Sequence, residues 1–358
     1  MSALFSPLML RDLELENRIV VSPMCQYSAV DGTANDWHVV NLGHFALSGP
    51  SIVFTEVVHV NLEGRITAGC LTLHNDENEA GLARVVDFVH TWTRSKVGIQ
   101  IGHAGRKGST KKPWEGEGFA YGPGSWQTVA PSAVPYGEWP APVALDDAGL
   151  QKIREDFVDS VNRANRIGFD AVELHFAHGY LGHQFLSPLS NQRTDQYGGS
   201  LENRMRFPLE LFDLARTAWP ANKPLGARIS ATDWVEGGWN LEGSIAFARE
   251  LKARGCDFLD VSTGGLSPLQ KIRAHGEGYQ VPFAAAIRKQ TGITTMSVGL
   301  ITDPEYADQI VQAGDTDLIA LARGVLRDPR WTWTAADVLG GESFVPNQYL
   351  RGRSTARP

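Results

Sequence analysis

Eight continuous apolar segments, each bounded by turn residues, constrain the fold of this 358-residue chain. Such segments are typical of strands buried on both faces of a parallel sheet. They cover residues 19–25, 51–60, 96–105, 170–179, 224–233, 257–265, 294–301 and 317–325. Amphipathic stretches lie between them, as in residues 146–168, where apolar side chains recur at three- and four-residue steps. This alternation predicts an α/β fold, a (β/α)8 TIM barrel.

An open doubly wound sheet is the alternative fold. Its two usual nucleotide-binding signals, GxGxxG at the start of a helix and GxxxxGK[ST], are absent from the sequence. Residues 107–143 follow the third segment, are rich in Gly and Pro, and are too long for a plain connection. We expect a single domain over 1–358, with 107–143 as an extended loop excursion over the active face and 340–358 as a C-terminal tail.

Composition and charge limit the partners that we expect. The net charge is −7, and lysine and arginine do not cluster, so neither a nucleic acid nor a membrane is an expected partner. The sequence has no run of about 18 apolar residues and no basic-then-apolar leader. Its three cysteines are far apart and odd in number, unlike a disulfide framework or a zinc motif. We therefore expect a cytoplasmic protein.

The fourth segment, AVELHFAHGYLGHQF, carries the densest group of reactive side chains. In a barrel of this kind the chemistry occurs at the carboxyl ends of the strands, where His175, His178 and Tyr180 would lie. The histidines have three interpretations: a metal site, a structural role, or a site for a substrate oxygen that becomes negative. Only two acidic residues, Glu56 and Glu173, are near, so a site for an anionic oxygen is favoured over a metal.

Two other strand ends suggest a bound cofactor. The seventh and eighth segments end in glycine-containing turns, with Arg323 in the second, which is where barrels commonly bind phosphate. The alternative is that these glycines only make tight turns. Cys25, at the end of the first segment, is interpreted as a polarizable group beside a bound ring. A nucleophile and a small buried apolar side chain are the alternatives for Cys25.

Six motifs together resemble the Old Yellow Enzyme family of flavin-dependent ene-reductases. They are SPMCQY (22–27), QIGHAGRK (100–107), ELHFAHGYLGHQFLSPLSNQRTDQYGGSLENRMRF (173–207), DVSTGG (260–265), SVGLITDP (297–304) and LIALARGVLRDP (318–329). The resemblance runs from about residue 4 to residue 352, in order. Cys25 followed by Gln and Tyr is similar to the thermophilic-like branch, which includes xenobiotic reductases.

The resemblance implies a barrel with FMN bound non-covalently at its mouth. The cofactor-binding residues that it implies are Pro23, Met24, Cys25, Val57, Gln100, Arg228, Gly299, Ala322, Arg323 and Arg351. Cys25 would lie near the reactive edge of the flavin. Arg351 would come from a neighbouring subunit of a homodimer or homotetramer. The resemblance implies no metal.

The implied reaction is the reduction of an activated alkene, such as an enone, a maleimide or a nitroalkene, with NADPH or NADH as the electron donor. His175 and His178 would bind the substrate oxygen, and Tyr27 would contact the substrate carbonyl from the other side. Tyr180 would donate the proton. Two alternatives stay open: a metal-dependent barrel hydrolase that uses His175 and His178, and a non-catalytic flavin-binding barrel.

Overall fold

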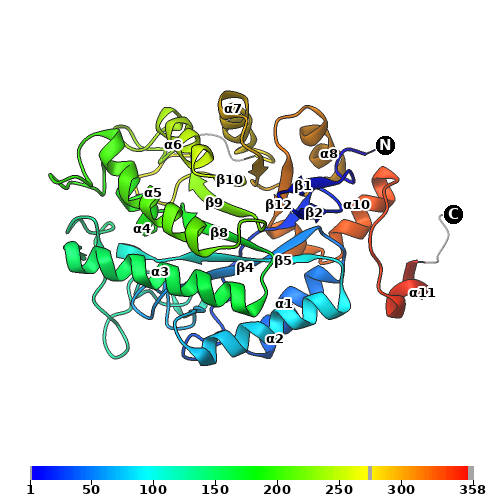
Figure 1. Ribbon diagram of the computed structural model, residues 1–358, viewed down its shortest axis with the longest axis horizontal. Helices are drawn as coiled ribbons and strands as arrows, with labels where there is room; N and C mark the ends of the chain where they lie inside the picture. Colours follow the sequence, from blue (N-terminus) through cyan, green and yellow to red (C-terminus); the bar gives the residue numbers. More distant parts are fainter. Residues whose placement is uncertain (1, 273–275, 354–358) are drawn as a thin grey trace.

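Eight parallel strands close into a barrel in the computed structural model, which describes residues 2–272 and 276–353. Neighbouring strands of the barrel follow one another along the chain, and the last pairs with the first (Figure 1). The predicted (β/α)8 barrel is therefore confirmed, and the open sheet is not formed. The barrel strands are β3 (Ile19–Val21), β4 (Ile52–His59), β5 (Lys96–Gly102), β8 (Ala171–Phe176), β9 (Leu225–Ser230), β10 (Phe258–Ser262), β11 (Thr295–Ser297) and β12 (Leu318–Leu321).

Helices surround this barrel, and each predicted amphipathic stretch forms one of them (Figure 1). The longer helices are α1 (Asp36–Ala46), α2 (Asp76–Trp92), α3 (Asp147–Ile167), α5 (Leu201–Ala218), α6 (Leu241–Ala253), α7 (Val281–Thr291), α8 (Pro304–Gln312) and α10 (Trp331–Leu339). Gly168 ends α3 in the left-handed conformation that favours glycine. Two short helices, α4 (Leu181–Leu186) and α9 (Arg323–Arg327), lie after β8 and β12 and were not predicted.

The strands are shorter than the apolar segments that predict them. β3 ends at Val21, although the first segment runs on to Cys25, because Pro23 has no N–H to donate to a sheet ladder. β8 ends at Phe176, so His178 lies beyond the strand, as expected from its position before Gly179. Several candidate site residues therefore lie in loops at the mouth and not on strands.

A hairpin that was not predicted closes the opposite end of the barrel. Strands β1 (Leu8–Leu10) and β2 (Leu13–Leu15) pair antiparallel before the first barrel strand. The side chains of Leu10 and Leu15 pack into one apolar cluster with the lower interior of the barrel. The hairpin was missed because three-residue strands carry too little alternation to be recognised.

Two phenylalanines fill the interior above this hairpin. The rings of Phe54 and Phe258 lie 6.0 Å apart between centroids. Each ring occupies space left by a glycine on a neighbouring strand. A Cβ added to Gly98 would lie 2.3 Å from the ring of Phe54, and a Cβ added to Gly226 would lie 2.4 Å from the ring of Phe258. The barrel interior is thus packed by side chains and is not an open channel.

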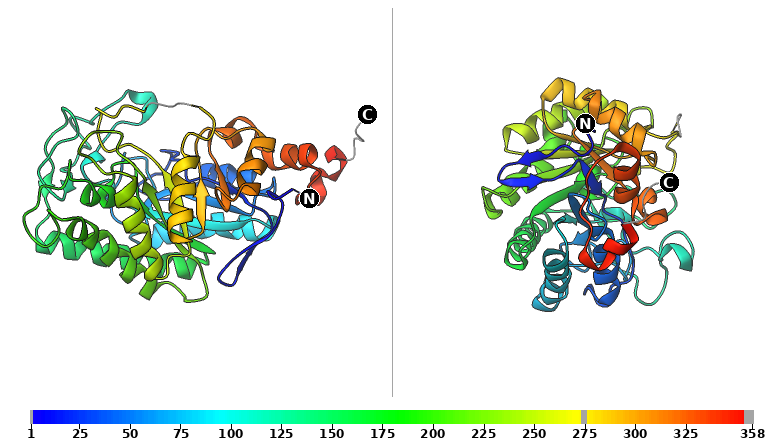
Figure 2. Two further views of the ribbon diagram at one scale, coloured as in Figure 1. Left: turned by 90° about the horizontal axis from the view of Figure 1, so that it is seen from above. Right: turned by 90° about the vertical axis from the view of Figure 1, so that its right-hand side faces the viewer.

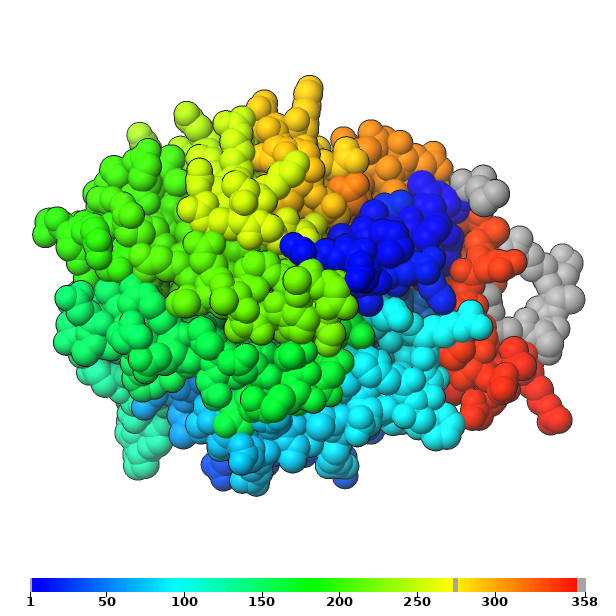
Figure 3. Space-filling view, viewed as in Figure 1, coloured from blue at the N-terminus to red at the C-terminus, as the bar shows by residue number. Residues whose placement is uncertain are grey.

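The excursion and the C-terminal segment lie at opposite ends of the molecule (Figure 2). The excursion forms η2 (Pro113–Glu115) and the short strands β6 (Val129–Ala130) and β7 (Val143–Ala144), and η1 (Gly105–Lys107) precedes it. The tail forms η3 (Asn347–Tyr349) and α11 (Leu350–Arg353), which project from the lower right of the surface in Figure 3. The part of the tail at 354–358 lies outside the described residues.

None of the helices in the described ranges is both long enough and apolar enough to cross a membrane.

Shortening Phe258, which is 1% exposed, tests the packing of the interior. We expect Phe258→Ala to lower the free energy of unfolding by about 3–5 kcal/mol, because it leaves a cavity beside Phe54. Denaturant titration followed by circular dichroism measures the change. Leu269→Ala, at a side chain that is 72% exposed, is the control and should change stability by less than about 0.5 kcal/mol. Equal effects of the two substitutions would contradict this packing.

Candidate active site

The loop after β3 is held in place by a bulge in β4. The register between β4 and β5 shifts between Phe54 and Val57, so the intervening residues bulge out of the ladder. The carboxylate of Glu56 accepts a hydrogen bond from the backbone N–H of Gln26 at 3.2 Å and lies 3.3 Å from Nε2 of His38. Glu56, which the sequence offered as a metal ligand, therefore supports the loop that carries Pro23, Met24, Cys25 and Tyr27.

Val57 faces the mouth from the same bulge. It packs with Cys70 and Ala104, and Cys25, Tyr27 and Tyr180 pack against this small cluster. Burial raises the pKa of the Cys25 thiol well above its usual value, so the thiol stays protonated at neutral pH. A thiol in this state is a poor nucleophile, which favours the interpretation of Cys25 as a polarizable neighbour of a bound ring.

His175, His178 and Tyr180 converge at the end of β8. The ring of His175 lies 5.1 Å from that of His178 and 5.1 Å from that of Tyr180, between centroids. Burial, reinforced by the nearby Arg228 guanidinium, lowers the pKa of both histidines well below 6.5. Burial raises the pKa of Tyr180 well above 10. At neutral pH the cluster therefore offers neutral imidazole N–H donors and a protonated phenol.

His178 is fixed by neighbouring strands. Its backbone lies in the left-handed region, with φ of 58°, which is uncommon for a residue with a side chain. Its N–H donates to Oγ of Ser230 on β9 at 2.9 Å, and its Nε2 lies 2.7 Å from Oγ of Ser262 on β10. Several contacts thus hold His178 in an uncommon backbone conformation, and residues held in this way are typical of functional sites. His183 lies 2.8 Å from Asp233 and accepts the N–H of Gly179, so its ring supports the turn that follows His178.

A buried charged network lies on β5, β8, β9 and β10. The side-chain amide of Gln100 donates to Oε1 of Glu173 at 2.6 Å, and Nε of Arg228 lies 2.9 Å from Oδ2 of Asp260. Burial, together with the charge of Asp260, raises the pKa of Glu173 to about 8. One guanidinium cannot neutralise two buried carboxylates, so Glu173 keeps its proton at neutral pH while Asp260 pairs with Arg228.

A cavity of about 240 Å³ leads from this network to the predicted phosphate turns. Arg228, His178 and Ser262 line it at one end, and residues 298–301 and 322–324 line it at the other. Gly299 has φ of 139°, and a Cβ added to it would come within 3.3 Å of the backbone of Gln280. The described residues thus fit FMN: the backbone at Gly299 and Ala322 with the side chain of Arg323 would hold its phosphate, and Arg228 would lie toward its ring.

Ser230, Ser262 and Asp260 are site residues that the sequence-based predictions missed. One signal in the sequence could have found them, because residues two apart on a strand face the same side of the sheet. Ser230 lies two residues after Arg228 on β9, and Ser262 lies two residues after Asp260 on β10.

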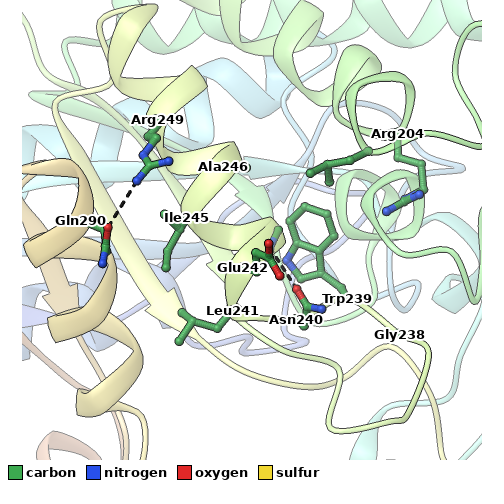
Figure 4. Close-up of a pocket in the computed structure, with 12 residues that line it drawn as sticks. Arg204, Gly238, Trp239, Asn240, Leu241, Glu242, Ile245, Ala246, Arg249 and Gln290 are labelled. Atoms are coloured by element: carbon green, nitrogen blue, oxygen red, sulfur yellow. Dashed lines mark hydrogen bonds between the residues drawn. The ribbon is translucent and has the colours of Figure 1, made fainter.

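Two further observations bear on the alternatives. Among the described residues, no group of three or more His, Cys, Asp or Glu side chains is arranged to hold a metal ion, so the ligand set that a metal-dependent hydrolase needs is not assembled. A cavity of about 640 Å³ lies between α5 and α6, where Arg249 donates to Gln290 at 3.3 Å (Figure 4). That cavity contains none of the predicted site residues.

Arg351 lies in α11, at the end of the molecule opposite the excursion (Figure 2). Within one chain, α11 and the histidine cluster are therefore far apart, and the role of Arg351 stays a prediction that requires a second copy.

Comparisons with known proteins identify the family of this chain. Residues 3–341 match the family described as "NADH:flavin oxidoreductase / NADH oxidase family". The chain is 43% identical over 354 residues to an NADPH dehydrogenase of Listeria innocua serovar 6a, covering 98% of this chain and 99% of that protein. It is 40% identical over 357 residues to an NADPH dehydrogenase of Bacillus subtilis (strain 168), covering 98% of each.

Among solved structures, morphinone reductase superposes with a TM-score of 0.79 at 27% identity, covering 97% of this chain and 92% of that one. Another structure of morphinone reductase, in complex with tetrahydroNAD, superposes with a TM-score of 0.78. From the family match, the near-complete coverage of the curated relatives and the shared barrel, the chain belongs to the NADH:flavin oxidoreductase / NADH oxidase family, also called the Old Yellow Enzyme family, and is an FMN-dependent NAD(P)H oxidoreductase.

Proposed function

We propose that this enzyme reduces activated carbon–carbon double bonds, with NADPH or NADH as the electron donor. The observation that carries the proposal is the convergence of two neutral imidazoles and one protonated phenol, in which the rings of His178 and Tyr180 each lie 5.1 Å from that of His175. Such a set binds an oxygen that becomes negative and supplies a proton beside it. The NADPH dehydrogenases among its relatives support the choice of electron donor.

FMN, when bound and reduced by NAD(P)H, supplies the hydride for this chemistry. His175 and His178 donate hydrogen bonds to the carbonyl or nitro oxygen of the substrate and so polarise its double bond. Neutral histidines suit this role, because they add N–H donors without adding buried charge. Tyr27, at φ of 52° in the supported loop, contacts the substrate carbonyl from the other side.

Tyr180 holds the proton that the α-carbon of the substrate receives. Its raised pKa means that the phenol is fully protonated at neutral pH before the reaction. Its position at the N-cap of α4, two residues after His178, keeps the phenol beside the oxygen-binding histidines. Pro23, Met24, Cys25 and Gln100 would line the flavin ring, and Gly299, Ala322 and Arg323 would hold its phosphate.

The direct test is a panel of enones, maleimides and nitroalkenes, assayed for NADPH or NADH consumption by the FMN-loaded protein without dioxygen. Consumption that requires the alkene supports the proposal. Flavin binding without consumption for any donor or alkene would instead identify a non-catalytic flavin-binding barrel.

Tyr180→Phe tests the proton donor. We expect it to slow oxidation of the reduced enzyme by an alkene on the order of 100-fold, because a general acid is lost. Reduction by NADPH, which needs no proton from Tyr180, should change little. Stopped-flow recording of flavin absorbance measures each half-reaction separately. Equal slowing of the two would argue against Tyr180 as the donor.

His175→Ala and His178→Ala test the oxygen site. Phenols imitate the enolate that forms in the reaction, so each substitution should weaken phenol binding at least about tenfold. Calorimetric titration of the oxidised enzyme gives the affinities. His90→Ala, at a half-exposed side chain on α2, is the control. Unchanged phenol affinity in a folded variant would remove that histidine from the oxygen site.

The histidines also predict a pH profile. Their pKa values are lowered well below 6.5, so both stay neutral as the pH falls from 8 to 6. In a Lys107→Met variant, which removes an amine beside His178 whose pKa of about 7 falls in that range, the affinity for a neutral enone should therefore be constant. A change in affinity centred near pH 6.5 would show that at least one of the imidazoles gains a proton there and is solvated.

We further propose that Arg351 completes the site of a neighbouring subunit in a homodimer or homotetramer. Arg351→Ala should then weaken substrate or flavin binding while leaving the fold intact. Light scattering and the half-reaction rates are the measurements. A monomeric protein with full activity would contradict this role.

A further inference from the structure

Lys107 is a charged group at the mouth that the mechanism above does not use. It ends η1, and its Nζ donates to the carbonyl oxygens of His178 and Gly265, each at 2.8 Å. The same Nζ lies 5.2 Å from the ring centroid of Tyr180 and 4.9 Å from that of Tyr136. Two carbonyl groups and two aromatic rings thus surround one ammonium group.

The two carbonyl groups belong to loops whose backbones touch. A Cβ added to Gly179 would lie 2.3 Å from the carbonyl oxygen of Gly265, and one added to Gly265 would lie 2.6 Å from Cα of His178. Lys107 bridges the two loops through its bonds to both carbonyl oxygens. Oγ of Ser230 adds a second link, because it accepts the backbone N–H of His178 and donates to the carbonyl oxygen of Gly264 at 2.8 Å. The ammonium therefore fixes the carbonyl side of a histidine that lies two residues before Tyr180.

We propose that Lys107 is a positioning residue for proton transfer: it fixes the His178–Tyr180 loop and stabilises the negative charge that Tyr180 acquires. The inference rests on the proposed function. In the step, the β-carbon of the substrate would receive the hydride that reduced FMN supplies, and the π bond of the alkene would break. The electron pair of that bond then takes the proton of Tyr180 at the α-carbon, so a C–H bond forms as the O–H bond breaks, and the phenolate takes up a proton from water afterwards. A buried phenolate is costly, and a cation facing its ring lowers that cost.

The proposal has a pH consequence. The charged and titratable groups around Lys107 are Arg106 beside it, Tyr136 in the excursion, His175 on β8, and His178 and Tyr180 after that strand. Burial, and secondly the charge of Arg106, lowers the pKa of Lys107 to about 7. Lys107 is then charged below that pH and neutral above it. Proton transfer should slow as the pH rises through about 7.

Lys107→Met keeps most of the length of the side chain and removes its amine and charge. We expect oxidation of the reduced enzyme by an alkene to slow at least about tenfold, with the pH dependence lost, while reduction by NADPH changes little. Lys111→Met, at an exposed lysine of the same excursion, is the matched control. If Lys107→Met does not fold, Lys107→Arg is the test variant. Because arginine keeps its charge, the rate of proton transfer in that variant should no longer fall above pH 7.

A double substitution separates positioning from a general loss of structure. If Lys107 acts through Tyr180, Lys107→Met should cost less than about threefold in the Tyr180→Phe background. A full additional loss there, or equal slowing of both half-reactions, would overturn the proposal.

Nuclear magnetic resonance of the wild-type protein with 13C-labelled lysine gives a readout that does not depend on activity. The signal that Lys107→Met removes should titrate near pH 7, and a midpoint above pH 9 would overturn the pH dependence. A protein that reduces no alkene would disprove the proposed function, whereas alkene reduction that slows in Tyr180→Phe but not in Lys107→Met would disprove only this inference.

Discussion

Closure of the barrel is the constraint on which the rest of the structure depends. Eight parallel strands that pair in sequence order present all their carboxyl ends at one mouth. Residues almost 300 positions apart in the chain, such as Cys25 and Arg323, are thereby brought to one site. The packed rings of Phe54 and Phe258 keep the lower interior filled, so the ligand can enter only at the mouth.

The chemistry of the mouth depends on charges that the barrel encloses. Arg228 is paired with Asp260 and adjoins Glu173, and its positive field helps to keep His175 and His178 neutral. The same guanidinium lines the cavity that leads to the phosphate turns. One buried cation thus acts on both histidines and also faces the space that suits the flavin, so replacing Arg228 should affect the two together.

Much of the fold could be predicted from the sequence, because buried parallel strands are long apolar runs and their helices are amphipathic. The position of His175 on β8 followed from alternation, and the positions of His178 and Tyr180 beyond the strand followed from Gly179. The hairpin β1–β2, the bulge in β4 and the Ser262–His178 contact could not be predicted. Each depends on which strands become neighbours in space, or on a local register shift, and neither is encoded in a short stretch of residues. The flavin-binding and catalytic roles came from the resemblance and not from periodicity.

The hairpin at the base of the barrel has a consequence for the order of folding. Leu10 and Leu15 belong to the same cluster as Phe258, Met296 and Leu318, and the N–H of Leu4 donates to Asp308 at 2.8 Å. The hairpin therefore packs against strands from both halves of the barrel, since Val20, Ile52 and Phe54 belong to the same cluster. Its leucines reach their full burial only when β10, β11 and β12 are in place, and contacts between residues so far apart in sequence form slowly. Complete burial of the hairpin and closure of the barrel are thus coupled.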